Sequence, residues 1–234
     1  MPEAEPHLAS ISSLGDRALI VRLGDRIDLE TFRRVCSLSR QLEDNCVDGL
    51  IEYVPAFSTV TVYYDPLRRT ALQMREAIEQ AIAQPDRVNV PPQRTVSIPV
   101  CYGGEFGEDL EFVAQQRGLT PEEAIEIHCG AEYLVYMLGF APGFPYLGGM
   151  SPRIATPRRD TPRVRTPAGS VGIAGEQTGV YPIETPGGWQ LIGRTPLALF
   201  RPQEDPPTLL LPGDTVRFVP ITAEQFHGTC EYAP

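Results

Sequence analysis

The sequence predicts an α+β fold in two domains, residues 1–90 and 91–234. The first ninety residues alternate between β-rich runs and helical patterns, whereas glycine and proline interrupt the later part too often for long helices. Between the two parts, residues 84–94 contain Pro85, Pro91 and Pro92, a composition typical of a linker. We therefore expect a sheet covered by helices, followed by a domain of short strands.

The first domain has the predicted order βαββα. The expected elements are strands at 18–23, 50–54 and 58–64, and helices from Asp28 to about residue 45 and at 70–83. Asp28 is the expected N-cap of the first helix, in which Phe32, Val35 and Leu38 recur at helical spacing. This order predicts an open sheet with helices on one side.

The second domain is predicted to be mainly β. The expected elements are strands at 95–100, 133–138, 190–192, 198–200 and 216–219, and helices at 109–116 and 121–128. The second of these helices has a strong start, with Thr120 as N-cap, Pro121 at the first position and Glu123 three residues after the cap. Short strands between many turns are typical of a closed barrel or a sandwich.

Composition excludes several classes of function. The formal net charge of −10 argues against nucleic-acid binding, which needs a cationic surface. All 20 basic residues are arginine, so no lysine is present to form a Schiff base or a P-loop. The 5 cysteines and 3 histidines show no zinc or disulfide pattern. Because no apolar run is long enough to span a membrane and the start is acidic, we expect a cytoplasmic protein without membrane association.

Arginine is concentrated between residues 150 and 201. This segment contains seven arginines (Arg153, Arg158, Arg159, Arg163, Arg165, Arg194 and Arg201) and three acidic residues. Two interpretations remain open: the arginines bind an anion such as a carboxylate or phosphate, or they pair with acidic residues elsewhere in the chain or in a partner.

Three other features are candidates for function. Residues 138–149, rich in glycine, proline and aromatic residues, are expected to form a shaped loop whose rings either fill the core or line a pocket. His128 ends a predicted helix, where the helix dipole favours its charged form; it acts as an acid, base or donor, or merely caps carbonyl groups. Ser170 does not match the nucleophile-elbow pattern and is expected to be a turn serine.

These segments resemble a known family. The sequences LGFAPGFPYLGG at Leu138, PAGSVGIAGEQTGVYP at Pro167 and TPGGWQLIGRTPLALF at Thr185 resemble signature blocks of the 5-oxoprolinase B-subunit family, also called the KipI or allophanate hydrolase subunit 1 family. Further similarity occurs in IPVCYGG at Ile98 and LLLPGDTVRFVP at Leu209. The resemblance extends from about Ser13 to Pro220.

The resemblance implies a fold and an activity. It implies a ferredoxin-like α+β domain followed by a cyclophilin-like β-barrel. It also implies a subunit that is inactive alone and cleaves 5-oxo-L-proline to L-glutamate with ATP and Mg, in a complex with the 5-oxoprolinase C subunit (KipA-type) and the A subunit (lactam-utilisation type). The alternatives are an inhibitor of a sporulation histidine kinase and an allophanate hydrolase-related or carboxyltransferase-like subunit that acts on another amide. Fold alone does not choose between them.

Motif position and residue chemistry select the candidate site. The candidate catalytic residues are His128, Arg158 and Arg159. The candidate substrate-binding residues are Phe140, Pro142, Gly143, Phe144, Tyr146, Arg165, Gly169, Ser170 and Gln177. We expect an arginine to bind a carboxylate or phosphoryl oxygen, His128 to donate to a carbonyl, and the aromatic rings to enclose the substrate ring. No metal ligands are predicted, and ATP is expected to bind with or through the partner subunits.

Overall fold

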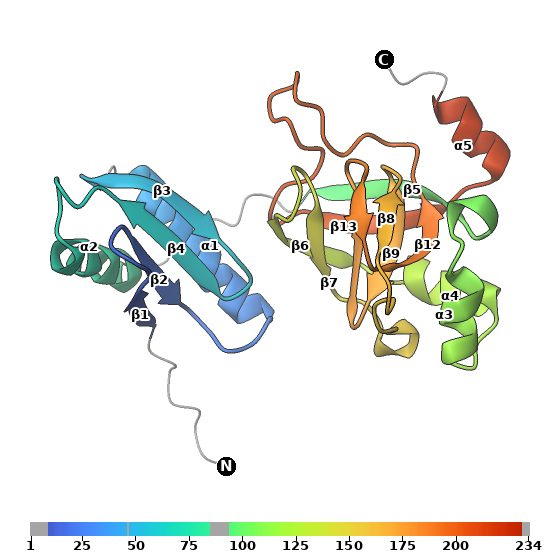
Figure 1. The fold of residues 1–234 in the computed structure, drawn as a ribbon, viewed down its shortest axis with the longest axis horizontal. Coiled ribbons are helices and arrows are strands. Elements are labelled where there is room, and N and C mark those ends of the chain that lie inside the picture. Colours follow the sequence, from blue (N-terminus) through green and yellow to red (C-terminus); the bar gives the residue numbers. More distant parts are fainter. Residues whose placement is uncertain (1–8, 46, 85–93, 231–234) are drawn as a thin grey trace, which may run out of the picture. The chain divides into compact units, whose positions relative to one another are not determined.

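The computed structural model describes residues 9–45, 47–84 and 94–230 (Figure 1). The chain divides into two compact units, Met1–Pro91 and Pro92–Pro234. Residues 85–93, which make up most of the expected linker, lie outside the described residues. The fold is mixed α+β, and the second unit contains a closed barrel of seven strands.

The first unit is a four-stranded antiparallel sheet with two helices. Its elements are β1 (Ser10–Ser13), β2 (Ala18–Arg22), α1 (Leu29–Asp44), β3 (Leu50–Pro55), β4 (Thr59–Tyr64) and α2 (Ala71–Ala83). The strand order is β1-β2-β4-β3. The predicted strands and helices are all present, but β1 was not predicted, because its sequence SISS has little of the apolar alternation that marks a strand.

Local signals explain where both helices begin. The Asp28 carboxylate accepts a hydrogen bond from the Thr31 amide at 2.8 Å, so the predicted N-cap of α1 is confirmed. Helix α2 begins with a capping box between Thr70 and Gln73. Alternate residues of β2 and β4, such as Leu19 and Val62, are buried in one cluster with residues of both helices. One face of the sheet therefore carries the core of this unit.

The second unit is built around the barrel. Its elements are β5 (Thr95–Tyr102), η1 (Gly104–Phe106), α3 (Leu110–Gln116), α4 (Pro121–Cys129), β6 (Tyr133–Leu138), β7 (Pro145–Gly148), η2 (Pro152–Ile154), β8 (Arg163–Thr166), β9 (Ser170–Ala174), β10 (Gln177–Val180), β11 (Thr185–Gly187), β12 (Gln190–Arg194), β13 (Thr215–Pro220) and α5 (Ala223–Cys230). The barrel order is β10-β7-β6-β13-β5-β12-β9, and β8 and β11 form a separate two-stranded sheet. All barrel pairs are antiparallel except β13 with β5.

The barrel interior is apolar, and one helix start agrees with the prediction. Ile98, Tyr133 and Val216, from three different strands, are fully buried in one cluster. At the start of α4, the Thr120 hydroxyl accepts from the Glu123 amide and the Glu123 carboxylate accepts from the Thr120 amide, which confirms the predicted capping box. Figure 1 shows α3 and α4 beside each other next to the barrel strands.

Two predictions for this unit were wrong. The segment 138–149 is only partly a loop, because Pro145–Gly148 forms β7, which pairs with β6 and β10. The expected strand at 198–200 is absent, and Phe200 forms only an isolated bridge with Thr208. A short apolar run forms a strand only where another segment of the protein pairs with it along its length. Within the described ranges, no helix is long and apolar enough to span a bilayer.

Candidate functional site

An aromatic hollow of about 230 Å³ lies on the barrel unit. It is lined by Phe140, Phe144, Tyr146, Arg158, Pro162, Tyr181, Pro186, Gly187, Gly188 and Trp189. These residues come from the turn before β7, from β7 itself, from the segment before β8, and from the connections around β11. We call this cavity the aromatic hollow. Its lining includes residues from all three signature blocks.

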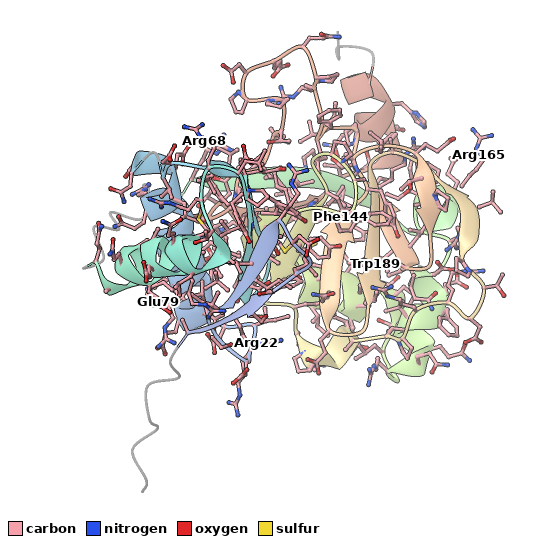
Figure 2. All side chains as sticks on the ribbon, turned by 60° about the vertical axis from the view of Figure 1, so that its left-hand side comes forward. Arg22, Arg68, Glu79, Phe144, Arg165 and Trp189 are labelled. Atoms are coloured by element: carbon pink, nitrogen blue, oxygen red, sulfur yellow. The ribbon has the colours of Figure 1, made fainter. Side chains whose placement is uncertain are left out.

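Phe144 is the centre of the hollow's wall. Its ring, 2% exposed, makes edge-to-face contacts with four other rings. The centroid separations are 5.5 Å to Phe140, 5.3 Å to Tyr146, 5.4 Å to Tyr181 and 5.5 Å to Trp189. Figure 2 shows Phe144 and Trp189 near each other on this unit. Edge-to-face pairs stabilise beyond simple burial, so these rings form a fixed apolar wall.

A tight turn presents Phe144 to the hollow. The amide of Gly139 donates to the Phe144 carbonyl at 3.1 Å, and the amide of Phe144 donates to the Ala141 carbonyl at 3.0 Å. Gly143 has φ of 79°, a conformation that glycine adopts without strain, and Pro142 precedes it. Neither Pro142 nor Gly143 lines the hollow. Their contribution is to shape the turn that carries the aromatic residues.

The structure separates the arginines into paired and unpaired residues. Arg159 and Arg163 both donate to the buried Asp109 carboxylate. Ion pairs also join Arg165 to Glu184 and Arg201 to Glu204, and Arg194 donates to the Ala168 carbonyl. Pairing with acidic residues therefore accounts for four of the seven arginines in this segment.

Arg158 differs from these residues. In the described part of the chain it has no hydrogen-bond or ion-pair partner, and it lines the aromatic hollow. Arg153 likewise has no side-chain partner there but lines neither this hollow nor the next one. Burial raises the pKa of Tyr181, and the charges of Arg158 and Arg163 act in the opposite direction, which places positive charge near the phenol. Arg158 is thus the guanidinium available to an anion in the hollow.

A second hollow shares Arg158 with the first. It has a volume of about 520 Å³, and its lining includes Asp109, Phe112, Arg159 and Asp160. The Nη1 atom of Arg159 donates to Asp109 at 2.8 Å, which makes Arg159 mainly a structural partner of that carboxylate. This hollow contains the predicted residue Arg159, but its acidic and basic groups are balanced.

The candidate catalytic residue His128 lies in the barrel core. It is fully buried and does not line the aromatic hollow. The Thr178 hydroxyl donates to the Gly172 carbonyl at 3.0 Å, so its oxygen is free to accept from His128 Nε2 at 2.9 Å. Nδ1 then accepts from the Tyr102 hydroxyl at 2.8 Å. We infer a neutral imidazole with its proton on Nε2.

The expected charged form of His128 was wrong. Burial lowers its pKa from 6.5 to about 3, and this desolvation outweighs any favourable effect of the end of α4. Both ring nitrogens are already used within the core. Its placement therefore supports a structural role and gives no support to contact with a substrate.

The remaining predicted residues do not line the aromatic hollow, although Gly169 and Ser170 form backbone hydrogen bonds with Tyr181, which does. Arg165 is exposed and paired with Glu184, and Figure 2 shows it reaching outward from the unit. Gly169 precedes β9 with φ of 81°, and Ser170, 2% exposed, is buried in that strand. Gln177 begins β10. None of these four lines the hollow.

Sequence reasoning missed several lining residues. Tyr181, Trp189 and the glycines at 187 and 188 all line the hollow. A signal existed, because Tyr181 lies in the block that begins at Pro167 and Trp189 in the block that begins at Thr185. Aromatic residues from each of the three blocks line this hollow, whereas the predicted polar residues Ser170 and Gln177 do not.

Thiol and metal chemistry find little support in the described residues. Burial raises the pKa of the Cys101 and Cys129 thiols, which disfavours the thiolate near neutral pH. Within the described ranges, no three residues among His, Cys, Asp and Glu gather closely enough to hold a metal ion. What the aromatic hollow can do chemically is bind: it offers flat apolar walls and one guanidinium.

Comparisons with known proteins place the chain in a family. Residues 9–210 match the family model described as carboxyltransferase domain, subdomain C and D. The 5-oxoprolinase B subunit of Bacillus subtilis (strain 168) is 53% identical over 232 residues, which cover 93% of this chain and 95% of the relative. The chain belongs to the 5-oxoprolinase B-subunit family. The resemblance identified from the signature blocks is therefore confirmed.

Two further relatives of this 5-oxoprolinase B-subunit family member extend the comparison. The 5-oxoprolinase B subunit of Escherichia coli O157:H7 is 43% identical and covers 93% of this chain and 96% of the relative. Among solved structures, TTHA0988 has a TM-score of 0.78 and 38% identity. That match covers 88% of this chain but 40% of TTHA0988, so the chain spans less than half the length of that protein.

Proposed function

We propose that this chain is one subunit of an ATP-dependent 5-oxoprolinase complex that cleaves 5-oxo-L-proline to L-glutamate. Its part in that complex is to bind the substrate. The observation that carries the proposal is the aromatic hollow, in which Arg158 is unpartnered among the described residues and stands beside a wall of aromatic rings. The names of the relatives support the same assignment.

The substrate has the chemistry that this hollow would recognise. 5-Oxo-L-proline is a five-membered lactam with one carboxylate. The carboxylate would bind the Arg158 guanidinium, because a charge-assisted hydrogen bond is strong where the anion is partly desolvated. The ring would lie against Phe144, Tyr146 and Trp189. A volume of about 230 Å³ suits a ligand of this small size.

The reaction supplies a reason for partners. Cleaving an unstrained lactam is difficult near neutral pH, and phosphorylation of the amide oxygen would make it a leaving group. The chain has no lysine and no Walker A motif, and its described residues include no acidic cluster fit to hold Mg. These residues are therefore a poor fit for ATP and Mg, and we assign both to the partners, the C subunit (KipA-type) and the A subunit (lactam-utilisation type).

The likeness of the first unit to ferredoxin-like domains and of the barrel to cyclophilin stays a prediction. A cytoplasmic location also stays a prediction.

The test is glutamate formation from 5-oxo-L-proline and ATP. We expect none from this chain alone, none from the partner subunits alone, and full activity from the mixture. Arg158→Gln should lower kcat/KM roughly 100-fold, the loss expected when a charged hydrogen-bond partner is removed. Arg153→Gln is the matched control, because this arginine lines neither hollow. Absence of activity in a mixture shown to assemble would overturn the proposal and favour the kinase-inhibitor or other-amide alternatives.

A further inference from the structure

Phe140 has the most unusual backbone of the aromatic hollow. Its φ is 65°, and among the described residues it is the one non-glycine residue with positive φ. The amide of Ala141 donates to the carbonyl of Gly139 at 2.7 Å, which closes a three-residue γ-turn around Phe140. A bulky side chain rarely adopts this conformation, because its Cβ crowds the backbone. The backbone at Phe140 is therefore strained.

The surrounding turn enforces this strain. The hydrogen bonds between Gly139 and Phe144, and between Phe144 and Ala141, fix the chain on the C-terminal side of the γ-turn. Glycine occupies positions 139 and 143 of this turn and would relieve the strain at position 140. A phenylalanine in this place calls for an explanation other than backbone geometry.

Core packing does not provide that explanation. The Phe140 side chain is 65% exposed, whereas Phe144 and Trp189 are 2% and 6% exposed. Its ring meets Phe144 at 5.5 Å with an interplanar angle of 74°, an edge contact that leaves most of the ring in solvent. The chain therefore keeps a large apolar ring at the hollow in a strained conformation with little burial in return.

We propose that Phe140 is a specificity-determining residue whose ring covers the face of a cyclic monocarboxylate in the aromatic hollow and discriminates against open-chain dicarboxylates. The identity of these molecules as 5-oxo-L-proline and its product L-glutamate rests on the proposed function. A flat ring presents C–H groups to an aromatic face and gains contact area there. An extended open chain has no such face.

The charge of the hollow acts in the same direction. Arg158 is the one cation among the residues that line it. Hydrolysis of the lactam adds a second carboxylate and an ammonium group, so an open-chain product carries three charged groups. One carboxylate would pair with Arg158, and the other two groups would have no charged partner among the residues that line the hollow, which costs free energy when they leave water. Ring opening therefore converts a ligand that fits the hollow into one whose added charges lie unpaired among apolar rings, which would favour product release.

Binding to the full chain, alone and in the assembled complex without ATP, tests the discrimination. Trp189 is the chain's single tryptophan and lines the hollow, so its fluorescence reports occupancy. The probes are cyclopentanecarboxylate, 5-oxo-L-proline and L-glutamate. We expect both cyclic probes to bind at least about 30-fold more tightly than glutamate. Phe140→Ala should weaken the cyclic probes about tenfold and leave glutamate unchanged, whereas Phe140→Tyr should retain the preference.

A matched pair of variants separates strain from ligand contact. Phe140→Ala and Phe140→Gly both remove the ring, but only glycine relaxes at positive φ. The Gly variant should therefore melt about 3 °C above the Ala variant and bind the cyclic probes equally weakly. Equal melting temperatures would contradict the strain, and unchanged preference for cyclic probes in both variants would overturn the proposed role of the ring.

The outcomes also distinguish this inference from the proposed function. Phe140-dependent binding of cyclopentanecarboxylate without binding of 5-oxo-L-proline would support the ring discrimination and count against the 5-oxoprolinase assignment. Cleavage of 5-oxo-L-proline by the complex with an unaltered cyclic preference in Phe140→Ala would do the reverse.

Discussion

Two polar centres in the barrel unit, His128 and Arg158, differ in whether their nitrogen atoms already have hydrogen-bond partners. The imidazole of His128 is fully buried, and both ring nitrogens have partners at 2.8 and 2.9 Å. The guanidinium of Arg158 is exposed and, among the described residues, has no partner. The imidazole therefore has no donor or acceptor left for a ligand, whereas the guanidinium still has its donors available.

The two centres differ in the hydrogen-bonding capacity that each has left for a ligand. Histidine is the commoner catalytic residue, and the sequence made His128 a catalytic candidate beside Arg158 and Arg159. The decisive property is whether a polar group still has a free donor or acceptor beside a cavity. By that criterion the described residues favour Arg158 as a binding residue and make His128 part of the core.

The free energy of unfolding should depend strongly on pH because of His128. The unfolded chain binds a proton at this histidine below pH 6.5, whereas the folded chain resists protonation until about pH 3. Stability should therefore fall as pH drops from 6.5 towards 3, by about 1.4 kcal/mol per pH unit and about 5 kcal/mol in all. Urea unfolding between pH 7 and pH 5 measures this slope before most carboxylates titrate.

His128→Gln supplies the control for that slope. Glutamine does not titrate, so the variant should show a nearly flat stability between pH 6.5 and pH 5, whatever its absolute stability. An unchanged slope would mean that His128 is not the buried titrating group, and the contrast between the two centres would lose its basis.

The next effect concerns the buried carboxylate of Asp109. It accepts from Arg159, from Arg163 and from the Leu191 amide, the last at 2.6 Å. Arg163 also donates to the Trp189 carbonyl, so Asp109 supports one wall of the aromatic hollow. Asp109→Asn should cost about 3 kcal/mol, because it leaves two guanidinium groups without their shared partner. The measurement is urea unfolding, with Trp189 emission as a local readout.

Glu108→Gln is the matched control for Asp109. Glu108 pairs with the same Arg163 at 3.3 Å, but its side chain is 67% exposed. An exposed pair contributes little, so we expect a change below about 0.5 kcal/mol and an unaltered Trp189 spectrum. Equal losses in the two variants would show that burial does not set the importance of Asp109.

Arg165→Gln should change neither stability nor activity. Arg165 pairs with Glu184 on the surface and does not line the hollow. The substitution should leave both the melting temperature and glutamate formation by the complex unchanged, in contrast to Arg158→Gln. A large loss of activity in Arg165→Gln would extend the substrate site beyond the aromatic hollow.

Much of the fold could be predicted because its signals are local. The caps at Asp28 and Thr120 and the apolar periodicity of α1 lie within a few residues of the elements they define. The pairing of β13 with β5 has no such signal, since it joins segments far apart in the chain. The edge strand β1 was missed because its polar residues lack the alternation of a half-buried strand.

The candidate site was only partly predictable for a related reason. Phe140, Phe144, Tyr146 and Arg158 were predicted and lie together around one hollow. The sequence does not reveal which arginine has a partner, because Arg159 and Arg163 find theirs in Asp109, some fifty residues away. It likewise does not reveal that His128 is buried at the end of a short helix. These properties depend on tertiary neighbours.

The parallel pairing of β13 with β5 has a consequence for synthesis of the chain. It aligns Thr95 with Thr215 and Pro220 with Val100. The first unit has all its strands and helices once residue 83 has been made and can fold while translation continues. The barrel lacks strand β13 until residues 215–220 have left the ribosome, so its apolar interior stays open until then. The second unit is therefore the part most in need of protection from aggregation during synthesis.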